Sequence, residues 1–290
     1  MQKYKYIWIF SLLILCVSCM RDKNKDCPYI PLHFSYKADG NEEVIGEYMD
    51  SAKLFVYNDQ EDLVEVKDLT KQDLIDGIHL YIPHGVYHVV CWGNLTDKTE
   101  LNNHASLSTA TINNIDLANH TMKTNSRAYW GAVTFDKYVC RTEDEFVLLE
   151  LESAHINLDI RLNDYIEREA EVKVHNLMPQ YNFSKLASLP SKETYSPQVE
   201  VFGDEKMQKA LLSVLRFNTK NPIVIEITTQ ANKDRPLLIP LEKYLAEHYP
   251  NLIVENQNEV TIVINAYFDA VHMSFVIPGW ESESGSATIK

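Results

Sequence analysis

Along most of the chain, apolar residues recur at alternate positions, and this period of two is the feature that most restricts the fold. Ile30, Leu32, Phe34 and Tyr36 alternate with other residues where the pattern begins. Side chains two residues apart lie on the same face of a β-strand, so the spacing predicts strands with a buried face.

Further segments repeat this alternation at similar intervals. They are residues 54–56, 63–66, 126–135, 146–151, 156–162, 171–175, 198–202, 222–229, 260–267 and 271–277. Many short strands without alternating helices predict a mainly β chain of antiparallel β-sandwiches.

The strongest local signal is a predicted hairpin. The alternating runs Ile78–Ile82 and Val86–Gly93 are separated by Pro83, His84 and Gly85. Pro and Gly favour a tight turn, so we expect the two runs to pair antiparallel. Trp92 and Trp130 lie within alternating strands and are expected in the core.

Two segments have helical spacing. In 239–248, Pro240 precedes Leu241, Tyr244 and Leu245, which share one helix face, and this predicts a short helix. Residues 207–217 fit both a helix and a strand, with a strand favoured for the second half. The sequence thus predicts one or two short helices.

One alternating run ends and another begins between Glu150 and Ala154. We therefore expect an N-terminal sandwich over residues 28–153 and a C-terminal sandwich over 154–280. Because no Gly/Ser-rich linker marks the boundary, the two are expected to touch.

A polar tail follows over residues 281–290. With two apolar residues near its end, it is expected to be mobile in the isolated protein. It would then pair with the edge strand of a partner on binding, or be an idle terminus.

The first 18 residues have the pattern of a secretory signal peptide. Lys3 and Lys5 precede an apolar run over 6–17 that only Ser11 interrupts. Such a run is too short to span the ~30 Å of bilayer hydrocarbon as a stable helix, so we expect it to be removed.

The signal peptide ends in a sequence that resembles the bacterial lipobox, in which a modified cysteine follows a small residue. Ser18 precedes Cys19, but Cys16 stands where leucine is usual, and Leu15 lies one place early. The pattern predicts lipidation of Cys19 and a charged tether over 19–27, held to a membrane by acyl chains. An ordinary signal with an incidental cysteine is the alternative. A redox CxxC is disfavoured inside an apolar run.

The charge of the chain excludes one class of partner. The whole chain has a net charge of −14, and removal of residues 1–18 takes away two lysines and no acid, which gives −16. A body this acidic lacks the basic face that nucleic-acid backbones require, so no nucleic-acid partner is expected.

Cleavage would leave Cys27, Cys91 and Cys140 beside Cys19. Three cysteines permit one disulfide at most, so no disulfide framework supports the fold. A Cys91–Cys140 bond and two buried free thiols both remain open.

No motif for catalysis or phosphate binding is present. The chain has no GxGxxG, GxxxxGK[ST], GxSxG or HExxH. His84 and His88 have a spacing that binds metal on a helix, but in an extended chain they would lie ~13 Å apart. No enzyme activity, cofactor or metal site is therefore expected.

Several short motifs follow the predicted lipidation site in order. They are Asp26–Pro28, Leu32–Tyr36, Pro83–Asn94, Leu215–Phe217, Ile239–Leu245 and Ile277–Trp280. In this order the chain resembles the fimbrillin-associated fimbrial anchor family, lipoproteins that fix fimbriae to the outer membrane of anaerobic Gram-negative bacteria.

The resemblance implies two tandem sandwiches of transthyretin-like type and a role as the basal subunit of a fimbrium, which anchors the fimbrium and limits its length. It implies pilin subunits as partners, joined by strand or edge pairing, and a surface-facing position on the outer membrane. Cys19 alone transfers as a site residue.

A surface glycan-binding lipoprotein of β-sandwich architecture is the alternative, and it would need exposed aromatic side chains that form a platform. A lipid-anchored enzyme is a third reading, which needs a pocket with perturbed ionisable groups.

Overall fold

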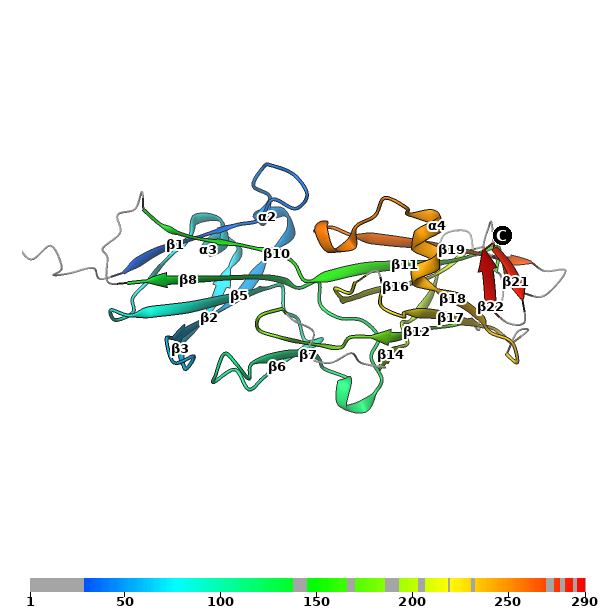
Figure 1. Ribbon diagram of the computed structural model, residues 1–290, viewed down its shortest axis with the longest axis horizontal. Coiled ribbons are helices and arrows are strands. Elements are labelled where there is room, and N and C mark those ends of the chain that lie inside the picture. The colour runs from blue at the N-terminus through cyan, green and yellow to red at the C-terminus, as the bar shows by residue number, and fades with distance from the viewer. Residues whose placement is uncertain are drawn as a thin grey trace, which may run out of the picture.

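A computed structural model shows an elongated, mainly β chain with two β-sandwiches in tandem (Figure 1). It describes residues 29–137, 145–165, 170–185, 193–202, 207–218, 220–230, 233–269, 274–276, 280–283 and 286–289. The prediction of a mainly β fold built of two tandem sandwiches is confirmed.

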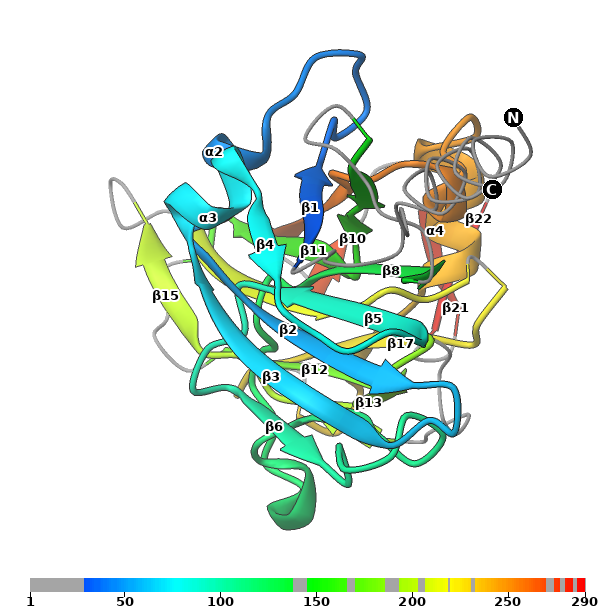
Figure 2. The same cartoon turned by 90° about the vertical axis from the view of Figure 1, so that its left-hand side faces the viewer.

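The N-terminal sandwich consists of a three-stranded and a five-stranded sheet. The small sheet has the order β4 (Ile78–Leu80), β1 (Ile30–Ser35), β9 (Val147–Glu150). The large sheet has the order β10 (Glu152–Ser153), β8 (Tyr129–Asp136), β5 (Val86–Gly93), β2 (Ser51–Asn58), β3 (Leu63–Thr70). Figure 2 shows β3, β2, β5 and β8 side by side.

The alternating residues of these strands form the core between the two sheets. Leu32, Leu54, Val89 and Leu149 come from four strands and are fully buried. The sheets approach closely at Gly131, where an added Cβ would lie 2.5 Å from Glu150 O.

A third sheet covers the other face of the large N-terminal sheet and joins the two halves of the chain. Its order is β13 (Gln180–Asn182), β7 (Thr111–Asn114), β6 (Thr99–Asn102), and η1 (Leu117–Asn119) follows β7. Phe183 packs on Phe55 and Trp92, with ring centroids 4.9 and 6.1 Å apart. The sequence has no Gly/Ser-rich linker between the halves, and we therefore expected them to touch. The structure shows that they do so through a shared sheet and a shared core.

The C-terminal sandwich has a five-stranded and a six-stranded sheet. The first has the order β15 (Val199–Phe202), β16 (Met207–Leu215), β11 (His155–Asn163), β19 (Thr261–Asp269), β20 (Ser274–Val276). The second has the order β14 (Glu193–Tyr195), β12 (Glu171–Leu177), β17 (Val224–Thr228), β18 (Leu237–Pro240), β22 (Ser286–Ile289), β21 (Trp280–Glu283). The predicted alternation is seen in β11, whose Ile156, Leu158, Ile160 and Leu162 are buried in this core.

The strand directions differ in part from the expected antiparallel arrangement. Most pairs are antiparallel, but β1 pairs parallel with β9, β11 with β19, and β18 with β22. The partners of each parallel pair are far apart in the sequence, so the connecting chain is long enough to return to the same end.

The predicted hairpin over 78–93 is wrong. β4 pairs with β1, whereas β5 lies between β2 and β8 in the other sheet. The Pro83–Gly85 turn therefore crosses from one sheet to the other. Both edges of β5 are occupied, and local turn chemistry does not distinguish such a crossing from a hairpin.

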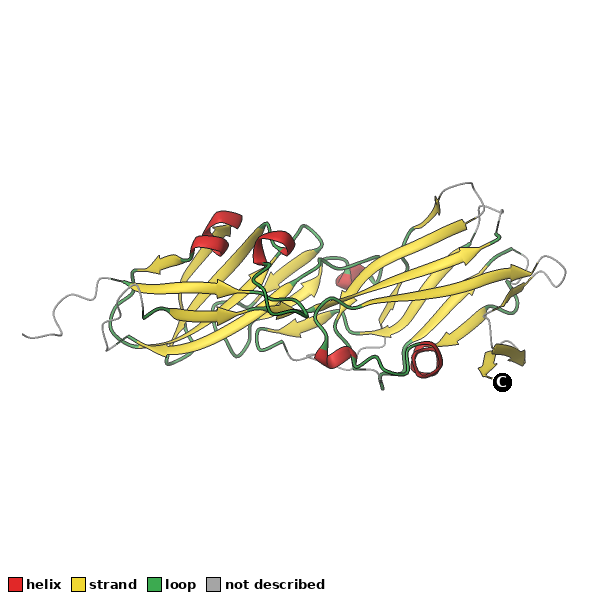
Figure 3. Cartoon of the chain, turned by 90° about the horizontal axis from the view of Figure 1, so that it is seen from above, coloured by secondary structure: helices red, strands yellow, loops and turns green. Residues whose placement is uncertain are grey.

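The predicted helix is confirmed as α4 (Leu241–His248), with Pro240 as its N-cap residue. The ambiguous 207–217 segment is a strand over Met207–Leu215. Two further short helices, α2 (Ile45–Tyr48) and α3 (Lys71–Asp76), and η2 (Val254–Asn256) were not expected. Figure 3 shows the helices as short segments beside long strands.

The expectation of a mobile tail is wrong for residues 281–283 and 286–289. Trp280–Glu283 and Ser286–Ile289 form a hairpin, and Ser286 pairs with Leu238 at the edge of β18. Main-chain pairing on a free sheet edge needs few apolar side chains, so the polar composition of this segment did not indicate that it forms strands.

Trp92 is fully buried, as predicted, and Trp130 is partly buried, with Nε1 donating to Phe183 O at 2.7 Å. Among the helices of the described segments, none has the length and apolar character needed to cross a membrane.

Candidate functional site

Cys19, the one site residue that the sequence predicts, lies outside the described residues, as do Cys27 and Cys140. Cys91 is a free thiol buried in β5, and burial raises its pKa to about 12. A thiol with so high a pKa is protonated near neutral pH and therefore a poor nucleophile.

His84 and His88 contact different groups. His84 Nδ1 lies 2.6 Å from Lys137 O, and His88 Nδ1 lies 2.9 Å from Thr134 Oγ1. Across the described part of the chain, no group of three or more His, Cys, Asp or Glu side chains is placed to hold a metal ion.

Arg216 joins several segments at the junction between the sandwiches. Its guanidinium donates to Ser153 O at 3.0 Å, to Asn258 O at 2.7 Å and to Val254 O. Asn258 in turn donates to Ala38 O at 2.7 Å. Arg216 therefore links the end of β10 to the loop before β19, and Asn258 links that loop to the N-terminal sandwich.

A second polar contact lies beside this junction. Glu259 accepts hydrogen bonds from the hydroxyls of Tyr36 and Tyr129, the latter at 3.1 Å. Burial, together with the nearby Glu259 carboxylate, raises the pKa of both tyrosines. Both hydroxyls thus stay protonated and donate, so the contact fixes the relative position of the two sandwiches.

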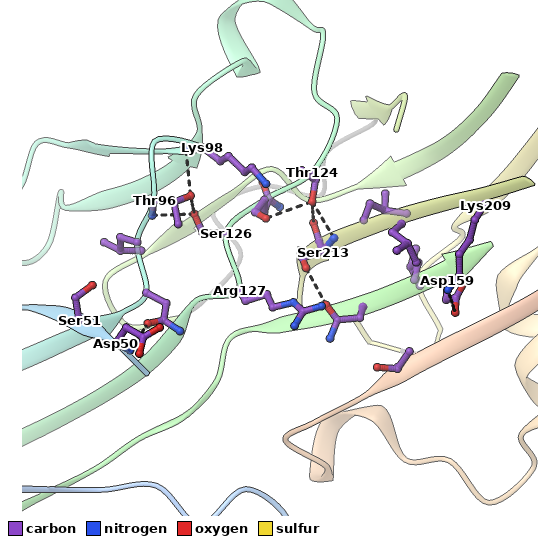
Figure 4. A pocket seen from close by; sticks show the side chains of 18 residues that line it. Asp50, Ser51, Thr96, Lys98, Thr124, Ser126, Arg127, Asp159, Lys209 and Ser213 are labelled. Atoms are coloured by element: carbon purple, nitrogen blue, oxygen red, sulfur yellow. Dashed lines mark hydrogen bonds and ion pairs between the residues drawn. The ribbon is translucent and has the colours of Figure 1, made fainter. Parts of the chain in front are cut away.

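A cleft of about 750 Å³ opens between the two sandwiches. Its floor is the outer face of the C-terminal five-stranded sheet, where β11, β16 and β19 present Asp159, Ser213 and Thr261. Its walls come from the N-terminal half, at residues 50–51, 94–96, 98 and 124–127. Figure 4 shows these side chains converging from both halves.

Half of the residues that line the cleft are neutral and polar, and hydrogen bonds fix its walls. Nine of its 18 lining residues carry a hydroxyl or a carboxamide, and none is aromatic. Thr96 Oγ1 lies 2.8 Å from Ser126 Oγ, and Ser213 N donates to Thr124 Oγ1 at 2.9 Å across the two halves. Such a lining can exchange hydrogen bonds with a hydrated polar ligand.

The charged residues of the cleft fall into two groups. Asp159 is paired with Arg161 at 2.7 Å and Lys209 at 3.2 Å, and Asp50 with Lys71 at 3.0 Å. Lys98 and Arg127 are exposed, and within the described segments neither forms an ion pair. The cleft thus presents two uncompensated cations in an acidic protein.

The free sheet edges differ in how they are protected. Edge strand β3 carries Glu65 and Lys67 on the side that faces the core, an arrangement that disfavours further pairing. Edge strand β15 has exposed Val201 (47%) and Phe202 (57%), and Leu211 (58%) is exposed on the adjacent strand. β15 therefore presents two exposed apolar side chains at a free edge, beside the charged Glu200.

An aromatic cluster lies on the outer face of β1 and β4. The rings of Tyr29 and His79 are stacked with centroids 4.1 Å apart, and the exposed Tyr81 lies 5.8 Å from Tyr29. It is outside the polar cleft.

The sequence did not indicate the cleft, because its residues are spread from Asp50 to Thr261. One local signal was present: Asp159 and Arg161 are charged residues two positions apart on the outward face of β11, which alternates with the buried apolar face of that strand.

These features define an elongated chain of two β-sandwiches that share a sheet and a core, with a cleft between them and a free sheet edge at β15. A family model for the fimbrillin-A associated anchor proteins Mfa1 and Mfa2 matches residues 24–284. The chain belongs to this family, which consists of structural anchor proteins rather than enzymes, and it has a fimbria-associated role at the cell envelope.

Solved structures share the fold. The fimbrial anchor protein Mfa2 from Porphyromonas gingivalis is 12% identical, with 90% of this chain and 99% of that chain covered and a TM-score of 0.63. A candidate adhesin from Bacteroides thetaiotaomicron VPI-5482 is 17% identical, with 91% and 98% covered and a TM-score of 0.67. A candidate polysaccharide-binding protein from the same organism is 13% identical, with 89% and 99% covered and a TM-score of 0.69. The comparison with curated proteins finds no match.

Proposed function

We propose that the protein is the lipid-anchored basal subunit of a fimbrium, which fixes the fimbrium to the outer membrane and limits its length. The observation that carries the proposal is the family match over residues 24–284. The shape supports it: β1, which follows the predicted tether, and the C-terminal hairpin lie at opposite ends of the long axis (Figure 1). One end can then face the membrane and the other the filament.

Attachment is proposed to depend on acyl chains on Cys19. Two or three chains hold a protein on a bilayer almost permanently, because each buried CH₂ contributes ~0.8 kcal/mol. Cys19→Ala should abolish fatty-acid labelling and move the protein to the soluble fraction. Cys27→Ala is the matched control, because it changes a cysteine in the same segment. Persistent labelling of Cys19→Ala would contradict this assignment.

Pilin binding is proposed to use edge strand β15. An incoming strand could pair with its main chain while burying Val201 and Phe202, so little sequence specificity is needed. Val201→Lys places a charge on this edge and should strongly reduce co-purification with pilin subunits. Val66→Lys is the matched control, because Val66 is similarly exposed (43%) on the protected β3 edge. If co-purification falls equally in both variants, or in neither of them, the pilin contact lies elsewhere.

Length limitation follows if the basal subunit ends assembly. Deletion of the gene should release intact fimbriae into the medium and lengthen them, as measured by electron microscopy of the culture supernatant. Restoration by the wild-type chain but not by Cys19→Ala would separate anchoring from assembly. Fimbriae that stay attached at normal length after deletion would refute the proposed function.

A further inference from the structure

We propose that the cleft between the two sandwiches binds an anionic saccharide, one whose sugar rings carry carboxylate groups. This site is separate from β15 and from the predicted lipid on Cys19. The inference does not depend on the proposed anchoring role.

The charged residues of the cleft favour a ligand with negative charge. Lys98 and Arg127 have no carboxylate partner in the described segments, although the chain as a whole carries a net charge of −14. In Figure 4 both side chains extend from the N-terminal half toward the region beside Thr124 and Ser213. An acidic group bound there would supply the missing countercharge and accept charge-assisted hydrogen bonds.

The neutral lining selects a ligand rich in hydroxyl groups. Ser51 and Thr261 are exposed, and Asn157 uses its Oδ1 to accept from Ser213 Oγ at 2.8 Å, so its amide nitrogen can still donate. These groups can exchange hydrogen bonds with sugar hydroxyls. Because no lining residue is aromatic, recognition would depend on hydrogen bonds and charge rather than on stacking, which favours an acidic sugar over a neutral one.

A buried acceptor in the floor supports the same conclusion. Asp159 Oδ1 is buried and has no hydrogen-bond donor within the described residues, while Oδ2 accepts from both Arg161 and Lys209. An unsatisfied buried carboxylate oxygen is unfavourable, and such groups in a native structure call for an explanation. A ligand hydroxyl would supply the missing donor once the side chains that cover Oδ1 move aside.

The size of the cleft fits an oligosaccharide. Its volume of about 750 Å³ lies within the range of ~300–1,000 Å³ that is typical of small-molecule sites. The hydrogen bonds between Thr124 and Ser213 join the wall of the cleft to its floor, so the site is preformed rather than assembled on binding.

Isothermal titration calorimetry on the mature full-length protein in neutral detergent tests the proposal. The probe is trigalacturonate, with maltotriose as the uncharged comparison and an acidic peptide of equal charge as the competing class. We expect trigalacturonate to bind and the other two not to bind. Raising the salt concentration should weaken binding, because Lys98 and Arg127 are exposed.

Arg127→Gln and Lys98→Gln should each weaken binding roughly tenfold, the loss of one charge-assisted hydrogen bond. Arg127 donates no hydrogen bond in the described chain, so its replacement should leave the thermal unfolding midpoint unchanged. Arg235→Gln is the control, because Arg235 is an exposed arginine outside the cleft. The proposal is overturned if trigalacturonate does not bind at millimolar concentration, if maltotriose binds equally well, if the peptide binds instead, or if Arg235→Gln weakens binding as much as Arg127→Gln.

Discussion

Replacement of Arg216 should weaken the junction between the two sandwiches and lower the free energy of unfolding. The guanidinium makes hydrogen bonds to the carbonyl oxygens of Ser153, Val254 and Asn258. A hydrogen bond to a charged group contributes roughly 1.5–3 kcal/mol, so these three contribute at most about 5–9 kcal/mol. A fourth, to His155 O at 3.4 Å, adds less because it is long. Water that enters the vacated space would solvate the freed carbonyls in part, and removal of the partly buried charge recovers its desolvation cost. We therefore expect Arg216→Ala to lower the free energy of unfolding by about 3–5 kcal/mol.

The fork shape of the guanidinium gives a second test. Arg216→Lys keeps the charge but cannot reach the same carbonyls in a plane, so it should still lose about 2 kcal/mol. Urea unfolding followed by circular dichroism measures both variants, and limited proteolysis reports whether the loop at Val254–Asn258 opens. Lys53→Ala, which alters an exposed ion pair on the N-terminal sheet, should change stability by less than about 1 kcal/mol. A loss in Arg216→Ala no larger than that of Lys53→Ala would refute the reasoning.

Three other predictions concern packing, capping and pH. Gly131→Val should cost at least about 3 kcal/mol in urea unfolding, because its Cβ would lie 2.5 Å from Glu150 O; Gly40→Ala, whose Cβ has no neighbour nearer than 3.5 Å, should be nearly neutral. Thr70→Ala removes the capping box that Thr70 and Asp73 form at α3 and should cost about 1 kcal/mol, whereas Thr70→Ser should restore most of it. Burial lowers the pKa of His155, with Arg127 and Arg216 acting in the same direction and Glu259 and the Ala128 carbonyl in the opposite direction. The unfolded chain, with a histidine pKa of about 6.5, then binds the proton first, so stability should be full above about pH 6.5 and decline as pH falls below it. His155→Gln should flatten this decline in thermal unfolding measured from about pH 7.5 to 5, and an unchanged slope would contradict the assignment.

Most strands could be predicted from the sequence, because the buried face of a strand appears as apolar residues at alternate positions. In β11, the alternation of Ile156, Leu158, Ile160 and Leu162 corresponds to one buried face. The helix α4 was found for a similar reason, since Leu241, Tyr244 and Leu245 are all buried. Local periodicity is a direct consequence of which face is covered.

Strand partners could not be found in this way. β5 has apolar residues on both faces because sheets cover it on both sides, and its two neighbours are distant in sequence. The turn at Pro83–Gly85 is compatible with a hairpin and with a crossing between sheets, and only the tertiary pairing decides. The cleft was missed for a related reason: Arg127 and Asp159 acquire a shared site only when the sandwiches meet.

The parallel pairing of β1 with β9 has a mechanical consequence. β1 is the first described strand, it runs along the long axis, and its register extends from Leu32 opposite Val147 to Ser35 opposite Glu150 (Figure 1). A pulling force applied through the N-terminus, as when a filament is dragged by flowing fluid, would slide β1 lengthwise past β9 and β4. The hydrogen bonds on both sides of the strand would then share the load instead of breaking one after another.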